Sequence, residues 1–294
     1  MKAPQQSKYI FFDPHRQNIT YCIILLEFPV VSTVVKKHHA TYHVHSTISE
    51  NNIMKHGQKG DLHAALQADY NSWGCVGNLK INDLFADLNL PLDNYHLTRA
   101  NKISYYQGEN AAELNAILLR FERTDGKNSG YGGEHISIIY DTKHHRLLGF
   151  TRMQAELDNT SPVSHQKALT TALNFMKQHA PDLIEKNMAI PEIITLSSDE
   201  RVEFKLGIKL GQLNLNWIAG HDEIIKADGA EKIVHGMKVK FQLPMQNLWA
   251  WVIVDKYGQV ETFERNISWD MNSMQRNTQM WLHDAWLQAQ KIKL

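Results

Sequence analysis

Cysteine is scarce in this sequence: only Cys22 and Cys75 occur among its 294 residues, and they do not form a CxxC pair. A disulfide framework and a cysteine-based zinc site are therefore both unsupported. The chain also lacks an excess of either charge, because Lys and Arg together number 31 and Asp and Glu together number 31. A balanced chain supplies no general field to attract nucleic acid or an anionic membrane, so we predict neither as a partner.

Long hydrophobic runs are missing as well. No stretch reaches the roughly 18 to 20 apolar residues of a membrane helix, and the nearest, residues 19–35, is interrupted by Glu27 and Pro29. The N-terminal region has few basic residues and no clear small-x-small cleavage site, so it is a poor signal peptide. We predict a soluble chain without an integral membrane span, and the weak signal favours the cytoplasm.

The composition divides the chain into three parts. Residues 1–53 show neither sustained helical nor sustained strand periodicity, and we interpret them as a poorly ordered leader or an over-extended N-terminus, with Met54 as the true start. The chain as a whole, with 43% hydrophobic and 21% charged residues, has a globular composition. We predict two α+β modules, residues 54–160 and residues 161–294, in which antiparallel sheets are each packed by helices.

Helical spacing appears in four places. Two short helices are expected over residues 61–69 and 81–88, and a long helix over residues 270–292 at the end of the chain. The strongest helix follows Ser161-Pro162, with Ser164 as an alternative N-cap, and carries an apolar stripe from Ala168 to Met176. Expected strands span residues 111–121, 134–141, 146–153, 192–196, 202–210, 213–218, 238–243 and 249–255.

Two of these hairpins share one pattern. A hydrophobic strand ends at Asp141 or Asp255, a tight turn follows, and the returning strand carries Phe-x-Arg, with arginine at Arg152 or Arg265. An aspartate at the end of a strand can accept hydrogen bonds from the free amides of the turn. The phenylalanine can anchor the hairpin on a helix, and the arginine on the same face can send its charged head outward.

These hairpins and the helix over residues 164–183 resemble the PepSY-like modules, particularly the repeated form in YcdB/YcdC-type bacterial proteins. The resemblance covers residues 131–265, and His144-His145 stands where a Thr-Gly turn is typical. It implies helices packed on antiparallel sheets, an extracytoplasmic location such as the periplasm, and a role in binding or inhibition. It carries over no catalytic residues.

Catalytic signatures are absent from the sequence. The chain contains no HExxH, GxSxG, Walker-type or GxGxxG motif, and Ser164-x-x-Lys167 is better interpreted as a helix cap than as a nucleophile pair. His38, His39, His43 and His45 could bind a metal, but we prefer to interpret them as part of a mobile polar leader, because no acidic or cysteine ligand accompanies them. We therefore predict no catalytic residue, no metal ligand and no cofactor.

Tryptophan is concentrated late in the chain, since six of the seven lie between Trp217 and Trp286. We predict an uncharacterised binding protein for a peptide, a protein or a small ligand. Its recognition surface is expected to contain Trp217, Trp249, Trp251, Arg152 and Arg265. The alternatives are a metal-dependent hydrolase that uses histidine ligands and a structural component of an envelope or assembly.

Overall fold

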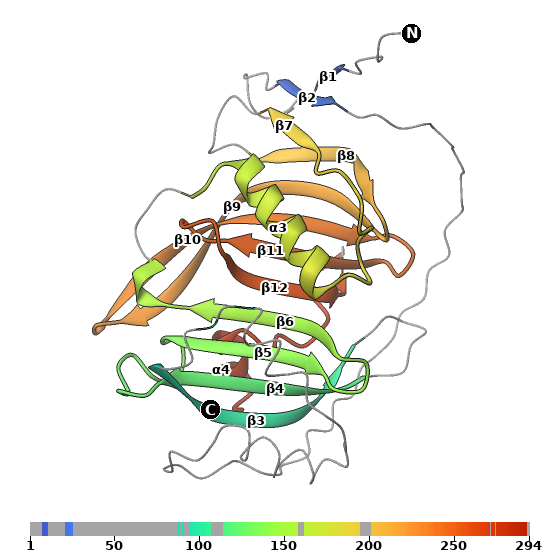
Figure 1. Cartoon of the computed structure of the whole chain (residues 1–294). Helices are drawn as coiled ribbons and strands as arrows, with labels where there is room; N and C mark the ends of the chain where they lie inside the picture. The colour runs from blue at the N-terminus through green and yellow to red at the C-terminus, as the bar shows by residue number, and fades with distance from the viewer. Residues whose placement is uncertain are drawn as a thin grey trace.

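A single nine-stranded antiparallel sheet forms the body of the protein (Figure 1). The computed structural model describes residues 8–10, 21–25, 88, 90, 94–106, 114–157, 162–194, 201–270, 272–273 and 275–292. The order of strands across the sheet is β3-β4-β5-β6-β12-β11-β10-β9-β8. These strands are β3 (Tyr95–Tyr105), β4 (Leu114–Arg123), β5 (His135–Asp141), β6 (Arg146–Met153), β8 (Val202–Leu210), β9 (Leu213–Ala227), β10 (Ala230–Leu243), β11 (Leu248–Val254) and β12 (Val260–Ile267).

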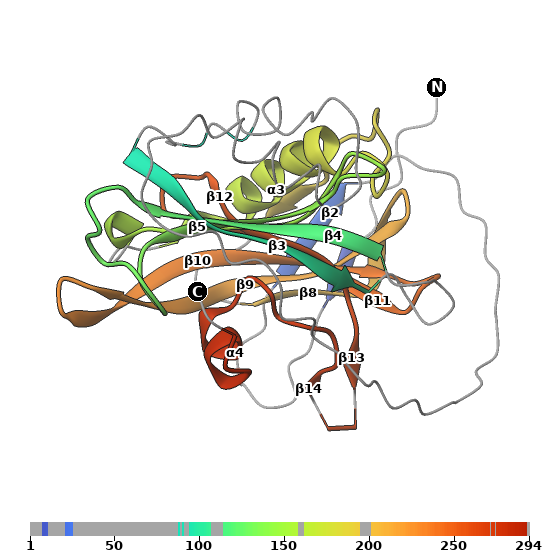
Figure 2. The ribbon, with the colours of Figure 1, turned by 90° about the horizontal axis from the view of Figure 1, so that it is seen from below.

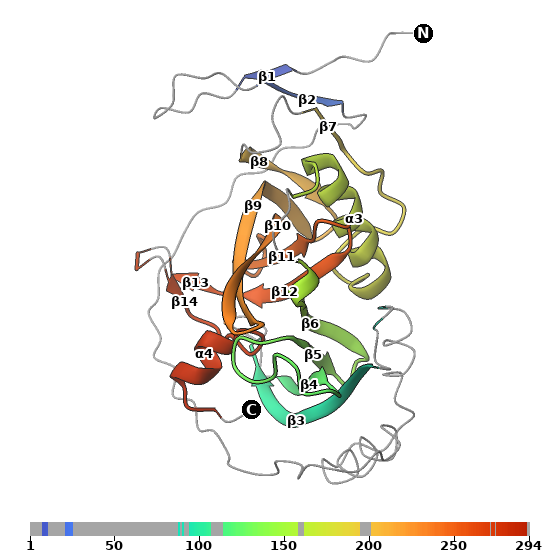
Figure 3. The same ribbon diagram turned by 90° about the vertical axis from the view of Figure 1, so that its left-hand side faces the viewer.

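The other described elements are short apart from one helix. A three-stranded sheet contains β1 (Lys8–Ile10), β2 (Tyr21–Leu25) and β7 (Glu192–Ile194), and β13 (Trp269–Asp270) pairs with β14 (Gln275–Arg276). The helices are the 3-10 turn η2 (Ala155–Leu157), α3 (His165–His179) and α4 (Asp284–Ala289). Helix α3 covers one face of the large sheet, whereas α4 and the β13–β14 hairpin lie on the opposite face (Figures 2 and 3).

The large sheet consists of two meanders, β3–β6 and β8–β12, that meet along β6 and β12. At this junction Phe150 lies opposite Phe263 and Thr151 lies opposite Thr262. Successive residues of a strand point to opposite faces, so the two phenylalanines share one face and the two threonines share the other. The junction therefore has one apolar side and one polar side.

The apolar side forms the main core under α3. The predicted stripe of this helix, from Ala168 to Met176, is fully buried against the sheet. The ring of Phe175 lies 6.5 Å from Phe150 and 5.4 Å from Phe263, so the phenylalanines of both hairpins anchor on one helix. Burial of this many apolar side chains on a single face is the main stabilisation of the fold.

The predicted α+β class with helices packing each sheet is wrong, because the protein is mainly β. The strands over residues 213–218 and 238–243 were expected to be short, but β9 and β10 run for 15 and 14 residues. The helix expected over residues 270–292 shrinks to α4 alone. Its first part forms β13 and β14, because the Asp270 carboxylate accepts hydrogen bonds from the Asn272 amide and the Ser273 hydroxyl, which favours a turn over a helix.

Both predicted hairpins are present, at β5–β6 and at β11–β12. The Asp141 carboxylate accepts from the amides of Lys143 and His144, and the Asp255 carboxylate accepts in the same way from amides of its own turn. Both aspartates are fully buried. The two reversals are thus alike, although both rest on the single helix α3 and belong to one sheet that continues past the predicted boundary at residue 160.

Two local predictions have clear outcomes, and several others fall on residues that the structure does not describe. The strand expected over residues 111–121 is confirmed as β4. The N-cap of α3 is Ser164 rather than Ser161, and its hydroxyl accepts from the Lys167 amide at 3.3 Å, as a helix cap does. The helix over residues 61–69, nearly all of the one over residues 81–88, the histidine cluster at 38–45 and Met54 lie outside the described residues.

Candidate functional site

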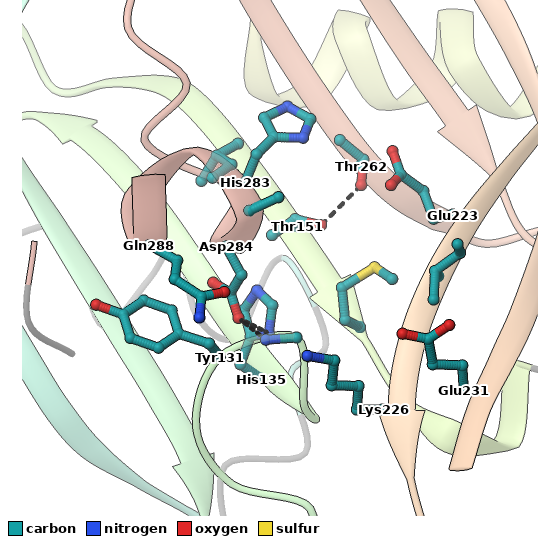
Figure 4. A pocket seen from close by; sticks show the side chains of 15 residues that line it. Tyr131, His135, Thr151, Glu223, Lys226, Glu231, Thr262, His283, Asp284 and Gln288 are labelled. Atoms are coloured by element: carbon teal, nitrogen blue, oxygen red, sulfur yellow. Dashed lines mark hydrogen bonds and ion pairs between the residues drawn. The ribbon is translucent and has the colours of Figure 1, made fainter. Parts of the chain in front are cut away.

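A cavity of about 310 Å³ opens on the polar face of the sheet, beside α4. Its walls come from the loop before β5, from α4 and from the β9–β10 ribbon, and its floor comes from β6 and β12. His135 and Asp284 lie on one side of it, and Glu223, Lys226 and Glu231 lie on the other (Figure 4). The volume is at the small end of the range for ligand pockets.

The floor is part of a row of polar side chains that crosses four strands. In the register of the sheet Arg120 lies opposite Ser137, Ser137 opposite Thr151, and Thr151 opposite Thr262. All four are buried, and the hydroxyls of Thr151 and Thr262 lie 2.7 Å apart in a hydrogen bond. Buried sheet positions are usually apolar, so this polar row marks the face as more than a second core.

His135 supplies a hydrogen-bond acceptor to the cavity wall. Its Nδ1 lies 2.9 Å from the Gly133 carbonyl oxygen, so Nδ1 carries the proton and Nε2 has a free lone pair. Burial lowers the pKa of His135 to about 4, and the Arg120 guanidinium acts in the same direction, so the ring is neutral near pH 7. Nε2 is buried and has no hydrogen-bond partner in the part of the chain that the structure describes.

Asp284 fixes α4 against the sheet and the loop. Its carboxylate accepts from both terminal nitrogens of Arg120, at 2.6 and 3.0 Å, and from the Gly132 amide at 2.6 Å. Arg120 also donates to Glu122 at 2.9 Å. Because these bonds join residues far apart in the chain, this wall of the cavity is held in place by charge-assisted hydrogen bonds.

The opposite wall carries three charged side chains. The Lys226 amide donates to the Gly132 carbonyl at 2.7 Å, and this bond ties the β9–β10 ribbon to the loop. Glu223 lies 3.0 Å from His221 Nε2; burial acts to raise the pKa of Glu223, but this contact and nearby His283 lower it overall. Within the part of the chain that the structure describes, Lys226 and Glu231 form no ion pair with each other, although they are directly opposite in the register.

A buried carboxylate connects the cavity to one of the predicted tryptophans. Glu264 accepts from Trp251 Nε1 at 3.1 Å, lies 2.9 Å from His283 Nε2, and forms an ion pair with Arg276 at 2.8 Å. Burial acts to raise the pKa of Glu264, but Arg276 and His283 outweigh it, and the pKa is strongly lowered. Glu264 is therefore ionised, and His283, which lines the cavity, is held by it.

The three predicted tryptophans lie together on the polar face, next to this network. Trp217 and Trp251 are both opposite Lys240 in the register of β10, so all three side chains share a face. The Lys240 ammonium lies 5.4 Å from the centre of the Trp217 ring and 4.3 Å from that of Trp249, within cation–π distance. Trp251 is buried, whereas Trp217 and Trp249 are partly exposed.

The two predicted arginines lie on the opposite face, under α3. Arg152 donates to Asp255 at 2.5 Å, and Arg265 donates through both terminal nitrogens to Asp182 at 2.9 and 2.6 Å. The expectation that these arginines send their heads outward is wrong for Arg265, which is almost fully buried. The tryptophans and the arginines therefore do not form one surface.

Glu261 is a buried acid that the sequence did not single out. Only 1% of it is exposed, and neither carboxyl oxygen has a hydrogen-bond partner among the described residues. Burial raises the pKa of Glu261 to about 8, and the carboxylates of Glu223 and Asp255 add to this effect. The residue precedes Thr262 of the cavity floor.

Together, the fold and the site define a β-rich protein with a small, partly enclosed polar cavity on one face of its sheet. No family model matches the sequence, and searches of curated proteins and of solved structures returned no significant match. Within the described ranges, no group of three or more His, Cys, Asp or Glu side chains is arranged to hold a metal ion. None of the helices in those ranges has the length and apolar character of a membrane span.

Proposed function

We propose that this protein binds a small polar ligand in the cavity between α4 and the β9–β10 ribbon. The observation that carries the proposal is His135, a residue of the cavity wall whose buried Nε2 has no hydrogen-bond partner among the residues that the structure describes. A buried polar atom that lacks a hydrogen bond costs stability, and most such atoms in proteins are paired. A ligand that donates a hydrogen bond to His135 would remove this cost.

The surroundings of His135 support the same role. The hydroxyls of Thr151 and Thr262 line the cavity floor, and the carboxylate of Glu223 lines the wall across from His135. Several convergent polar groups in a small pre-formed cavity are typical of a ligand site. Since Asp284 is already paired with Arg120, the cavity is held open by contacts that need no ligand.

Binding can be followed at His135 itself. The protein is labelled with ¹⁵N at its histidines, and a library of polar metabolites is added while the Nε2 resonance of His135 is recorded by NMR. A ligand that donates to Nε2 should shift this resonance away from that of a free acceptor. If compounds bind the protein but leave the His135 resonance unchanged, the cavity is not the site and the proposal is wrong.

Two substitutions sharpen the test. His135→Phe removes the acceptor, and its affinity for a bound compound should fall by roughly tenfold or more. His135→Gln keeps an acceptor in the same place and should recover part of the affinity. His144→Phe, at an exposed histidine in the β5–β6 turn, is the control and should bind like the wild type. Equal affinity for all three variants would contradict the proposal.

The tryptophan face is a second candidate, for a peptide. Trp217 and Trp249 are partly exposed and hold Lys240 between their rings, an arrangement that offers both aromatic surface and a positive charge. Trp249→Ala should then weaken capture of an acidic, aromatic peptide without unfolding the protein, and circular dichroism checks the fold. Unchanged capture would remove this candidate.

A further inference from the structure

Lys226 and Glu231 place two opposite charges at the mouth of the cavity without neutralising each other. The two residues are directly opposite in the β9–β10 register, where oppositely charged side chains normally attract each other. Both are exposed, both line the cavity, and among the described residues neither forms an ion pair.

The loop before β5 explains why the pair stays apart. The carbon stem of Lys226 lies on Gly132, where its Cδ is 3.4 Å from the position that a Cβ would take. The Lys226 amide also donates to the carbonyl of the same glycine. Lys226 is therefore drawn toward the loop, while Glu231 stays on the ribbon, and the space between them belongs to the cavity (Figure 4).

We infer that the ligand is a small zwitterion of the α-amino acid type, with an ammonium and a carboxylate on neighbouring atoms. This inference rests on the proposed function. The carboxylate of the ligand would pair with Lys226. Its ammonium would face Glu231 and Glu223, and a remaining N–H would donate to His135 Nε2.

Other simple ligand classes fit less well. A plain anion would pair with Lys226 but would also meet the carboxylates of Glu223 and Glu231. A plain amine would satisfy those carboxylates and leave Lys226 without a counter-charge. A neutral polyol would leave Lys226 and Glu231 without a counter-charge as it displaced their water, which costs free energy. The volume of about 310 Å³ favours a single amino acid over a longer peptide.

The test uses the full-length protein and matched probes. Each of the standard L-α-amino acids is titrated in turn, by calorimetry and by the His135 Nε2 resonance. The strongest binder is then compared with its decarboxylated amine and with its deaminated acid. At least one amino acid should bind, and removal of either charged group should weaken binding by roughly tenfold or more.

Two exposed positions test the assignment of the charges without risk to the fold. Lys226→Met should weaken binding of the amino acid, because its carboxylate contact is lost, but should not weaken binding of the decarboxylated amine, because the substitution removes a charge that repels a cation. Glu231→Gln should weaken binding of the amino acid but should not weaken binding of the deaminated acid, because the substitution removes a carboxylate that repels an anion. Lys209→Met, an exposed lysine on β8, is the control and should change neither.

The outcomes separate this inference from the proposed function. If polar metabolites shift the His135 Nε2 resonance but no amino acid does, the cavity remains a ligand site and the inference of a zwitterionic ligand is wrong. The inference is also wrong if the decarboxylated amine or the deaminated acid binds as tightly as the amino acid. If no compound of either kind shifts His135, both proposals are refuted.

Discussion

Removal of the buried charge at Glu261 should make the protein more stable in alkaline solution. In the folded protein the pKa of Glu261 is raised to about 8, mainly by burial, against an ordinary value of 4.5. Between these two pH values the folded state holds a proton that the unfolded state has released. Stability therefore falls as pH rises from about 4.5 to about 8, and the loss is complete above that range.

The magnitude follows from the two pKa values. The interval from 4.5 to about 8 corresponds to about 5 kcal/mol, at about 1.4 kcal/mol for each pH unit. Glu261→Gln has nearly the same shape and cannot ionise, so it escapes this loss. The variant should match the wild type within about 1 kcal/mol near pH 4 and exceed it by up to about 5 kcal/mol near pH 9.

Urea unfolding at pH 4, 7 and 9 measures the effect, with fluorescence of the tryptophans as the probe. Glu231→Gln serves as the matched control, because its carboxylate is exposed and its loss should not change the pH dependence. A difference between Glu261→Gln and the wild type that is the same at pH 4 and pH 9 would refute the reasoning. So would a variant that is relatively less stable at pH 9.

Three further substitutions test the packing around the polar face. Gly236→Ala should lower the free energy of unfolding in urea by about 1–3 kcal/mol, because its Cβ would lie 2.5 Å from a methyl group of the neighbouring strand. At Gly220 a Cβ meets nothing within 4 Å, so Gly220→Ala should change the stability by under about 0.5 kcal/mol. Trp251→Phe removes a hydrogen bond to a buried carboxylate and should cost about 1–3 kcal/mol, while Trp249→Phe at a partly exposed position should cost less than about 1 kcal/mol. Arg120→Met leaves two buried carboxylates without their cation and should lower the stability by about 3–5 kcal/mol, and a loss under about 1 kcal/mol would contradict this account.

Local signals in the sequence predicted the elements whose determinants are local. The turns at Asp141 and Asp255 need only the aspartate and the amides that follow it, so both hairpins could be found. The stripe of α3 and its cap at Ser164 likewise lie within one helix. The helix predicted over residues 270–292 was too long: α4 forms around Trp286, but the side chain of Asp270 closes a turn that replaces its first part.

The candidate site could not be predicted, because its contacts join distant segments. Arg120 and Asp284, which hold the cavity wall, are 164 positions apart, and the pairing of Thr151 with Thr262 spans 111 positions. Nothing in the sequence around His135 distinguishes it from the other histidines. The tryptophans were grouped because they are concentrated late in the chain, but the placement of the arginines depends on which face α3 covers. That choice is a property of the whole sheet.

The seam between β6 and β12 also bears on how the protein folds and opens. Each meander forms from strands that are adjacent in sequence, whereas the seam has only three paired residues on each strand and closes a much longer loop. Closure of long loops is the slow step in the folding of β proteins, so the two meanders are expected to form before they dock. The floor of the cavity crosses this seam, and a compound bound there would hold the two halves together. Slower hydrogen exchange of the β6 and β12 amides would report its presence.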